Sequence, residues 1–192
     1  MNGYLAMKRT LDVLVSLVLA PFVVPVCLIL MVAVRLESPG SPLFVQQRVG
    51  RHRVSFGMVK LRTMRADTEH VASHLVSHDK ITRVGQVLRR FKLDELPQLW
   101  NVLTGSMSLV GPRPCLPVQD LLIAERERHG VFAYRPGITG PAQIIGLDMS
   151  QPRRLAEVEA AYFTRATLLQ DLELVLKTAT GKGGGDAALK RS

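Results

Sequence analysis

The chain has its longest apolar stretch close to its beginning. Residues 13–34 contain no Asp, Glu, Lys or Arg. As a helix this stretch would be about 33 Å long, which is enough to cross a hydrocarbon core of about 30 Å. Pro21 and Pro25 lie near its middle, one helical turn apart, and each removes a backbone hydrogen bond from a helix. Lys and Arg residues flank both ends, which favours placing both ends on the cytoplasmic side.

These features predict a re-entrant helical hairpin over residues 1–36, which enters one leaflet and returns, with its elbow at Pro21, Val24 and Pro25. The alternative is an ordinary spanning helix with a kink at the prolines. A cleaved signal peptide fits less well, because its apolar region would be shorter and followed by small residues.

Beyond the apolar stretch, the hydrophobic pattern predicts a β-hairpin followed by helices. Residues 43–50 and 54–64 are rich in Val, Phe and Met and are joined through a Gly-Arg-His-Arg turn. Residues 135–143 (RPGITGPAQ) predict a loop with a restricted backbone path. The predicted helices cover residues 64–77, 84–90, a segment that begins near Asp94, 118–129, 151–165 with Ser150 as N-cap, and 168–179.

The expected fold is therefore an α-rich α/β fold, formed as a single small membrane domain. It combines the N-terminal re-entrant hairpin with a short β-hairpin and amphipathic helices at the membrane interface. Residues 1–36 would form the membrane segment, residues 37–180 the catalytic region, and the glycine-rich residues 181–192 a disordered tail. A spacing of four residues puts His70, His74 and His78 on one helix face, and this favours a solvated polar face over a metal site.

Net charge narrows the choice of partners. The chain carries 25 Lys and Arg against 16 Asp and Glu, a net charge of +9, which implies an anionic partner. Aromatic residues make up only 5% of the sequence, so stacking platforms for single-stranded nucleic acid are poorly supported. We therefore expect a phosphate-bearing substrate and anionic lipid headgroups as partners, and no nucleic acid.

An acidic pair, Asp94 and Glu95, is the strongest candidate for chemistry. It follows the basic residues Arg89, Arg90 and Lys92 and precedes a rigid Gly-Pro-Arg-Pro turn at residues 111–114. Positive charge around two carboxylates suits a substrate whose phosphates must be neutralised while a carboxylate approaches. As the N-cap of the following helix, Asp94 would stay ionised near the positive end of the helix dipole. A solvated helix face with chance ion pairs is the alternative.

Motifs along nearly the whole chain resemble those of the bacterial sugar transferase family, the small monotopic phosphoglycosyl transferases. The longest is the block LDELPQLWNVLTGSMSLVGPRP at residues 93–114. The other matching positions are Lys8-Arg9, Asp12, residues 46–50 (QQRVG), 60–64 (KLRTM), 82–85 (TRVG), 135–140 (RPGITG), Tyr162, Asp171 and residues 176–178 (LKT).

This resemblance implies a reaction and a set of roles. Asp94 would be the nucleophile that attacks the β-phosphate of a UDP-sugar, with release of UMP, and polyprenol (undecaprenyl) phosphate would then take the phosphosugar. Mg²⁺ would be the cofactor, held by Asp94 and Glu95, although Glu95 could instead handle a proton. The expected substrate-binding residues are Lys60, Arg62, Arg89, Arg113, Arg135 and Gln143.

The resemblance also implies a location in the bacterial inner (cytoplasmic) membrane, with the catalytic region on the cytoplasmic face and downstream glycosyltransferases as partners. Three positions depart from the family pattern. Val24 replaces a common Ser before the elbow proline, Leu147 stands where a basic residue is common, and Glu159 replaces a common Asp. A catalytically weak membrane module that binds nucleotide-sugars or partner enzymes is therefore the alternative function.

Overall fold

A computed structural model describes residues 2–65 and 80–180 of the chain. Three predicted features lie wholly or mostly outside the described residues. They are the histidines His70, His74 and His78, the tail at residues 181–192, and the helix predicted over residues 64–77, of which only the first two residues are described. Of those two, Met64 does not begin a helix but pairs with Ile81 in an isolated antiparallel bridge.

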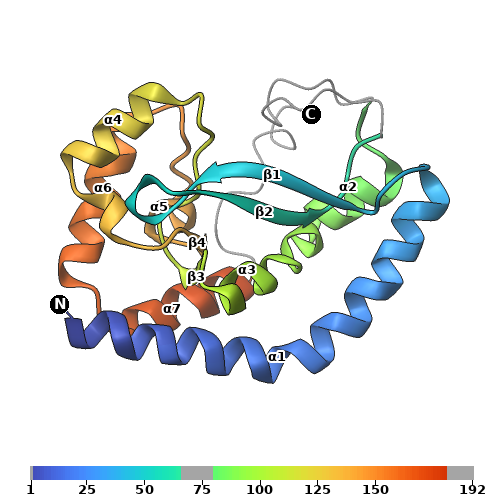
Figure 1. The fold of residues 1–192 in the computed structure, drawn as a ribbon, viewed down its shortest axis with the longest axis horizontal. Helices are drawn as coiled ribbons and strands as arrows, with labels where there is room; N and C mark the ends of the chain where they lie inside the picture. The colour runs from blue at the N-terminus through green and yellow to red at the C-terminus, as the bar shows by residue number, and fades with distance from the viewer. Residues whose placement is uncertain (1, 66–79, 181–192) are drawn as a thin grey trace.

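The first element is a helix, α1 (Asn2–Glu37), which passes through both Pro21 and Pro25 without a break. Figure 1 shows that α1 bends part-way along and follows the edge of the molecule. The segment predicted to form a re-entrant helical hairpin is therefore one continuous, bent helix in the structure. Each proline removes a single hydrogen bond, and the bonds of neighbouring turns keep such a helix continuous.

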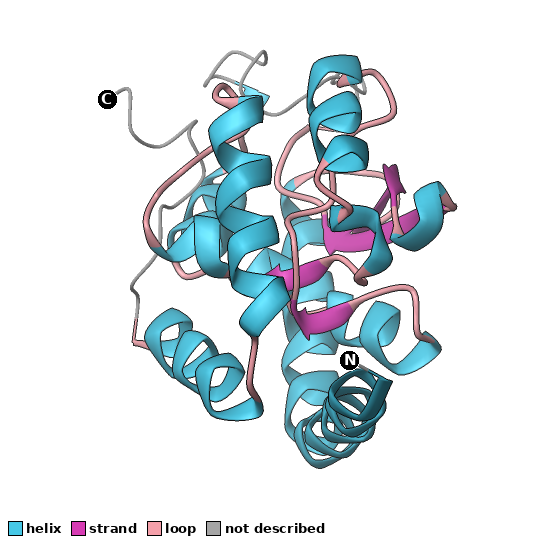
Figure 2. Cartoon of the chain, turned by 90° about the vertical axis from the view of Figure 1, so that its left-hand side faces the viewer, coloured by secondary structure: helices cyan, strands magenta, loops and turns pink. Residues whose placement is uncertain are grey.

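Most of α1 is not covered by the rest of the protein. In its most apolar window only 6% of the residues are buried, and the helix is long and apolar enough to cross a membrane. Phe22 and Ile29 are exposed over 70% and 68% of their surfaces. Figure 2 shows the remaining elements lying to one side of the N-terminal end of this helix. An apolar surface of this extent needs lipid or a partner, which is consistent with a membrane anchor.

The predicted β-hairpin is confirmed. Strand β1 (Leu43–Val49) pairs antiparallel with β2 (Ser55–Leu61), and Leu43 lies opposite Leu61. The short 3-10 turn η1 (Arg51–Arg53) joins them, with His52 and Arg53 at positive φ. The hairpin runs across the middle of the molecule in Figure 1.

After the hairpin, α2 (Arg83–Arg90), η4 (Leu93–Glu95) and α3 (Gln98–Thr104) follow in quick succession. The predicted helix at residues 84–90 is confirmed. The prediction that Asp94 caps the next helix is wrong, because Asp94 lies inside η4 and Pro97 is the N-cap residue of α3.

A second, parallel pair of strands joins β3 (Ser108–Val110) to β4 (Gly137–Thr139). The expected loop at residues 135–143 therefore contains a strand and the short helix α5 (Pro141–Ile144). Three-residue strands are too short for alternation to reveal them. Gly111 permits the close approach of the two backbone segments, because a Cβ there would collide with the backbone of Arg135 and Gly137.

The remaining helices complete the fold. The helices α4 (Asp120–Arg128) and α6 (Pro152–Arg165) pack together. The 3-10 turn η5 (Val131–Ala133) lies between them in the sequence. The last helix, α7 (Leu168–Ala179), lies beside α1 in Figure 1. The bounds predicted for α7 are confirmed, and Thr167 with Gln170 forms a capping box at its start. Gln151, not Ser150, is the N-cap of α6, because the Ser150 hydroxyl donates instead to Asp148. The described chain is helix-rich with a few short strands, as predicted.

Three apolar clusters hold these elements together. One joins the end of β1 to α4 and α6, one joins the end of α1 to β2 and α2, and one joins β2 to α3. Their buried members are Val49, Cys115, Leu122, Phe132, Ala142 and Leu155; Val34, Leu61 and Leu88; and Met58, Val102 and Met107. The turn η4 (Leu93–Glu95) contacts α2 and β2, and its Leu93 packs against the second cluster, so the Asp94-Glu95 pair sits on a well-packed part of the fold.

Candidate active site

The acidic pair lies in the 3-10 turn η4, between α2 and α3. Lys92 ends α2 in the left-handed conformation, with φ at 56° and ψ at 23°, which reverses the chain before Asp94. A left-handed conformation costs a residue with a Cβ about 1 kcal/mol, so surrounding contacts must hold it. Asp94 is 8% exposed, so its carboxylate is held within the fold and not on a solvated helix face.

Glu95 is fixed by an ion pair across to the hairpin. The Lys60 ammonium on β2 lies 2.8 Å from Glu95 Oε1, and the two side chains are only 19% and 20% exposed. Burial opposes ionisation of Glu95, but the positive charges of Lys60 and Arg113 outweigh it and lower the pKa of this carboxyl. The site therefore holds Glu95 as a carboxylate next to two cations that sequence reasoning predicted there.

The helix that carries Arg89 is positioned from both ends. At its start the Glu37 carboxylate, at the end of α1, accepts the backbone N–H groups of Arg83 and Val84 at 2.7 and 2.8 Å. Near its end Arg89 is buried, and its Nε donates to the Thr63 hydroxyl at 2.9 Å. The end of α1 thus caps the helix that leads into the acidic pair.

Asn101 holds α3 against the hairpin, a role that sequence reasoning missed. Its side-chain oxygen accepts the N–H of Val59 at 3.0 Å, and its side-chain nitrogen donates to the Gly57 carbonyl at 2.8 Å. The amide thereby pairs with an edge of β2 as a neighbouring strand would. Because Lys60 follows Val59 directly, this contact sets the position of Lys60 relative to the turn η4.

A buried ion pair supports the Gly-Pro-Arg-Pro turn. Arg126 on α4 makes two hydrogen bonds to Glu159 on α6, at 2.9 and 2.6 Å, and both side chains are almost fully buried. The Glu159 carboxylate also accepts the backbone N–H of Arg113. Glu159 therefore anchors the backbone that presents Arg113 toward Glu95. Charged residues 33 positions apart give no sequence signal of such a contact.

A second polar cluster ties the start of α1 to α6 and α7. The Asp171 carboxylate accepts hydrogen bonds from the Tyr4 hydroxyl at 2.8 Å, the Lys8 ammonium at 2.7 Å and the Tyr162 hydroxyl at 2.7 Å. Nearby, buried Asp12 accepts from the Ser108 hydroxyl and the Leu109 N–H. These contacts fix the beginning of α1 on the body of the protein.

Three residues predicted to bind substrate lie elsewhere in this structure. The Arg62 guanidinium donates to the carbonyls of Ser38 and Pro39 and closes the turn after α1. Arg135 donates to the carbonyl of Gly105, which follows the C-terminal end of α3, whereas Asp94 precedes the N-terminal end of this helix. The length of α3 therefore separates Gly105 from Asp94 by about 10 Å or more. Gln143 donates to the Ile138 carbonyl within its own loop. The structure places Lys60 and Arg113 beside Glu95, and it places Arg89 on α2, which packs against η4.

Comparison with known proteins identifies the family. The bacterial sugar transferases match the sequence over residues 3–182, which covers all but the first described residue. The chain belongs to this family. The 93–114 block, which lies within the matched residues, forms η4, α3, β3 and the Gly-Pro-Arg-Pro turn.

Several curated proteins are similar to this family member. A UDP-glucose:undecaprenyl-phosphate glucose-1-phosphate transferase of Caulobacter vibrioides is 41% identical, over 89% of this chain and 67% of that protein. A UDP-N-acetylgalactosamine-undecaprenyl-phosphate N-acetylgalactosaminephosphotransferase of Aeromonas hydrophila is 37% identical, over 91% of this chain and 43% of that protein. The exopolysaccharide production protein PSS of Rhizobium leguminosarum is 36% identical, over 93% of this chain and 96% of its own length. The chain therefore spans only part of the first two relatives.

The structure also accounts for one departure from the family pattern. Leu147 packs against the apolar cluster that includes Val49, Cys115 and Leu155. A basic side chain at this position would have to leave that cluster to reach solvent. Leu147 therefore acts in packing here.

Proposed function

We propose that this protein transfers a sugar phosphate from a UDP-sugar to polyprenol phosphate, with Asp94 as a covalent nucleophile. The observation that carries the proposal is the buried Asp94 beside Glu95, which Lys60 and Arg113 surround with positive charge, in a sugar transferase family. The names of the relatives from Caulobacter and Aeromonas supply the donor and acceptor classes, a UDP-sugar and undecaprenyl phosphate.

The reaction would run in two displacements at one phosphorus atom. A carboxylate oxygen of Asp94 attacks the β-phosphorus of the UDP-sugar, the bond to the bridging oxygen breaks, and UMP leaves with that bond's electron pair. A phosphate oxygen of the lipid then attacks the same phosphorus, and the Asp94 carboxylate departs. Dividing the transfer in this way lets a soluble donor and a lipid acceptor use one site in turn.

Lys60, Arg89 and Arg113 are suited to the charge that develops on the transferring group. A phosphoryl transfer is catalysed mainly by positioning and by neutralisation of the equatorial oxygens. Lys60 and Arg113 already act on Glu95, so a diphosphate bound beside this carboxylate would meet the same cations. Arg89, held by Thr63, would contribute a third.

Asp94 and Glu95 also fit the requirements of a magnesium ion. Mg²⁺ binds one or two protein carboxylates together with substrate phosphates and water, and it does not need a complete protein cage. The described residues contain no group of three or more His, Cys, Asp or Glu that could form such a cage. When bound, the ion would neutralise phosphate charge, and these two neighbouring carboxylates are the residues that would hold it.

For the membrane segment we propose a re-entrant placement in the bacterial cytoplasmic membrane, with the site on the cytoplasmic face. The bend of α1 and its contacts at both ends with the same body, through Lys8 to Asp171 and through Glu37 to α2, support it. Cysteines at positions 3 and 40, in a variant without Cys27 and Cys115, would be labelled from the same side. Labelling from opposite sides would establish a spanning helix.

The activity is tested with the purified chain, Mg²⁺, undecaprenyl phosphate and a panel of UDP-sugars that includes UDP-glucose and UDP-N-acetylgalactosamine. We expect UMP release with at least one donor, and this chain should be the only protein that the reaction requires. A lack of UMP across the panel, with stable nucleotide-sugar binding, would favour the alternative function of a binding module. The lipid-linked product would be the substrate of a glycosyltransferase that adds the next sugar.

A further inference from the structure

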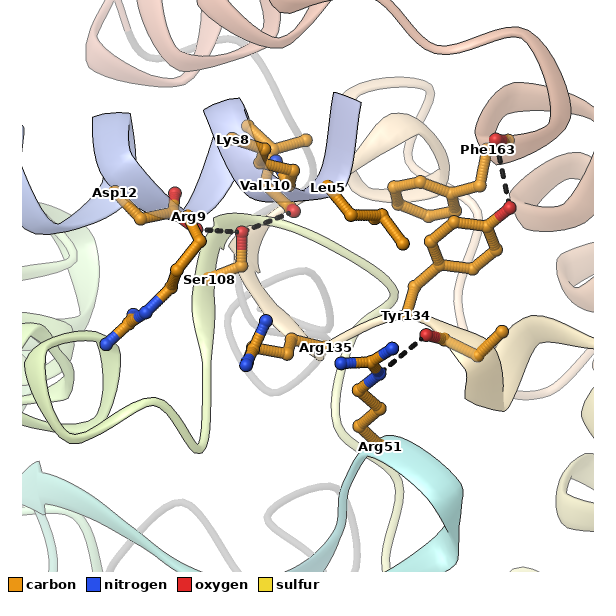
Figure 3. Close-up of a pocket in the computed structure, with 11 residues that line it drawn as sticks. Leu5, Lys8, Arg9, Asp12, Arg51, Ser108, Val110, Tyr134, Arg135 and Phe163 are labelled. Atoms are coloured by element: carbon orange, nitrogen blue, oxygen red, sulfur yellow. Dashed lines mark hydrogen bonds between the residues drawn. The ribbon is translucent and has the colours of Figure 1, made fainter. Parts of the chain in front are cut away.

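A second basic site lies away from the acidic pair, in a hollow between the start of α1 and the body of the protein (Figure 3). Its empty volume is about 320 Å³, including its open mouth. Four basic side chains and one carboxylate line it, namely Lys8, Arg9, Arg51, Arg135 and Asp12. Figure 3 shows Arg135 between Arg9 and Arg51, along the side of the hollow opposite Lys8 and Asp12.

The three arginines are held in place by backbone carbonyls. Arg9 donates to the carbonyls of Val102 and Leu103 at 2.5 and 2.9 Å. Arg51 donates through Nε to the Ala133 carbonyl, and Arg135 donates through Nε to the Gly105 carbonyl, both at 2.8 Å. A guanidinium has five N–H groups, so Arg51 and Arg135 each keep donors available after these single bonds.

The positive charge of this cluster is only partly balanced by the protein. Among the described residues, no carboxylate lies within ion-pair distance of Arg9, Arg51 or Arg135, and Lys8 is already paired with Asp171. The Asp12 carboxylate accepts hydrogen bonds from the neutral donors Ser108 and Leu109, and its single negative charge offsets only part of the charge of the three arginines. Burial and the neighbouring charges of Arg51 and Arg9 lower the pKa of Arg135. An oxyanion would relieve this repulsion.

Capping of α3 explains part of this arrangement but not all of it. Arg9 and Arg135 contact carbonyls at the C-terminal end of α3, where cations are favourable. Arg51 makes no such contact, because its partner is Ala133 in η5. Its approach to Arg135 therefore adds repulsion without satisfying that helix end.

The place of the hollow indicates the source of the anion. Its α1 residues, Leu5 to Asp12, directly precede the uncharged stretch at residues 13–34, where headgroups would meet the hydrocarbon. Asp94 lies at the opposite end of α3, about 10 Å or more away. The two sites are therefore separate.

We propose that Arg9, Arg51 and Arg135 form a phosphate-binding site that takes the headgroup phosphate of an anionic membrane lipid. A soluble phosphate would satisfy the same chemistry, so the test includes both sources. Forked guanidinium donors suit the oxygens of a phosphate. This inference does not rest on the proposed function, because its readout is binding and not UMP release.

The test measures binding to the full chain in detergent, with phosphatidylglycerol, phosphatidylcholine and inorganic phosphate as separate probes. Native mass spectrometry follows the lipids, and equilibrium dialysis follows the phosphate. Arg51→Gln removes one member of the site, and Arg53→Gln is the matched control, because Arg53 is 59% exposed on the same turn and faces Glu127. We expect Arg51→Gln to weaken binding about tenfold and Arg53→Gln less than twofold.

Preferential retention of phosphatidylglycerol with this variant pattern would establish a lipid site. The same pattern with inorganic phosphate alone would support the site with a soluble ligand. Binding of neither phosphatidylglycerol nor inorganic phosphate, or equal effects of the two variants, would overturn the proposal. Should Arg51→Gln not fold, Arg51→Lys keeps the charge but loses the fork and should weaken binding at least about threefold, while unchanged binding would overturn the proposal.

Discussion

The Lys60 ammonium lies 2.8 Å from the Glu95 carboxylate, in a contact that joins the hairpin to the acidic turn. This pair is partly buried, so it is less screened than a surface ion pair. It places a cation on the residue next to the proposed nucleophile, Asp94. The site is therefore built on a strand and a turn that hold each other in position. Such an arrangement suits a reaction that depends on positioning.

Replacing Lys60 by Met should lower the rate of UMP release about 10- to 100-fold, because one cation near the transferring phosphoryl group is lost. Arg153→Gln is the control, since it breaks an ion pair with Glu157 in which Arg153 is 78% exposed. The control should stay within about twofold of the unmodified protein. Equal rates for Lys60→Met and the unmodified protein would remove Lys60 from the site.

Stability in acid should depend on Glu95. Its pKa is lowered in the folded protein, so it stabilises the fold above its unfolded pKa of about 4.3, and that contribution is lost as the pH falls through the lower folded pKa. Glu95→Gln should therefore flatten the fall of the melting temperature below about pH 4.3. Parallel melting profiles for the two proteins between about pH 3 and 6 would contradict a lowered pKa.

The buried Arg126–Glu159 pair should show strong coupling. Arg126→Met or Glu159→Leu alone leaves an uncompensated buried charge, which costs about 3–5 kcal/mol. For a chain of this size the melting temperature should fall by about 6–20 °C. The double variant removes both charges and should recover most of the loss. Additive losses in the double variant would mean that the two residues act independently.

The prolines should control the path of α1. With Pro21→Ala and Pro25→Ala together, each turn regains its backbone hydrogen bond, and a straight apolar helix of this length favours crossing the membrane. A cysteine at position 3 should then become accessible from the side opposite to position 40. Labelling that is unchanged from the protein with both prolines would show that contacts such as Lys8 with Asp171 decide the topology instead.

Much of the fold could be predicted from local patterns. Two runs rich in Val, Phe and Met joined by a turn predicted the hairpin, and one apolar face predicted α7. The parallel strands β3 and β4 could not be found in this way, because α4 and η5 lie between them in the sequence and each strand is only three residues long. Such pairs depend on contacts that no local pattern records.

For the candidate site, the structure confirms that Lys60 and Arg113 lie beside Glu95, but it corrects how Asp94 and Arg62 were expected to be positioned. Charge and motif predicted a role for Asp94 and Glu95, which stays a prediction, but the N-cap role of Asp94 was wrong because Lys92 takes a left-handed conformation and η4 intervenes. Arg62 shares the alternation of Lys60, yet β2 ends at Leu61 and the Arg62 side chain turns to the carbonyls of Ser38 and Pro39. Tertiary contacts decided both outcomes.

The most direct test of the account is the intact mass of the protein after incubation with a UDP-sugar that supports UMP release, without the lipid acceptor. The unmodified chain should gain the mass of one phosphosugar and release an equal amount of UMP. Asp94→Asn should show no adduct and a rate of transfer to lipid at least about a thousandfold lower, while Asp120→Asn on the surface of α4 should behave as the unmodified chain. Retained transfer by Asp94→Asn, or an adduct on another residue, would contradict the central claim.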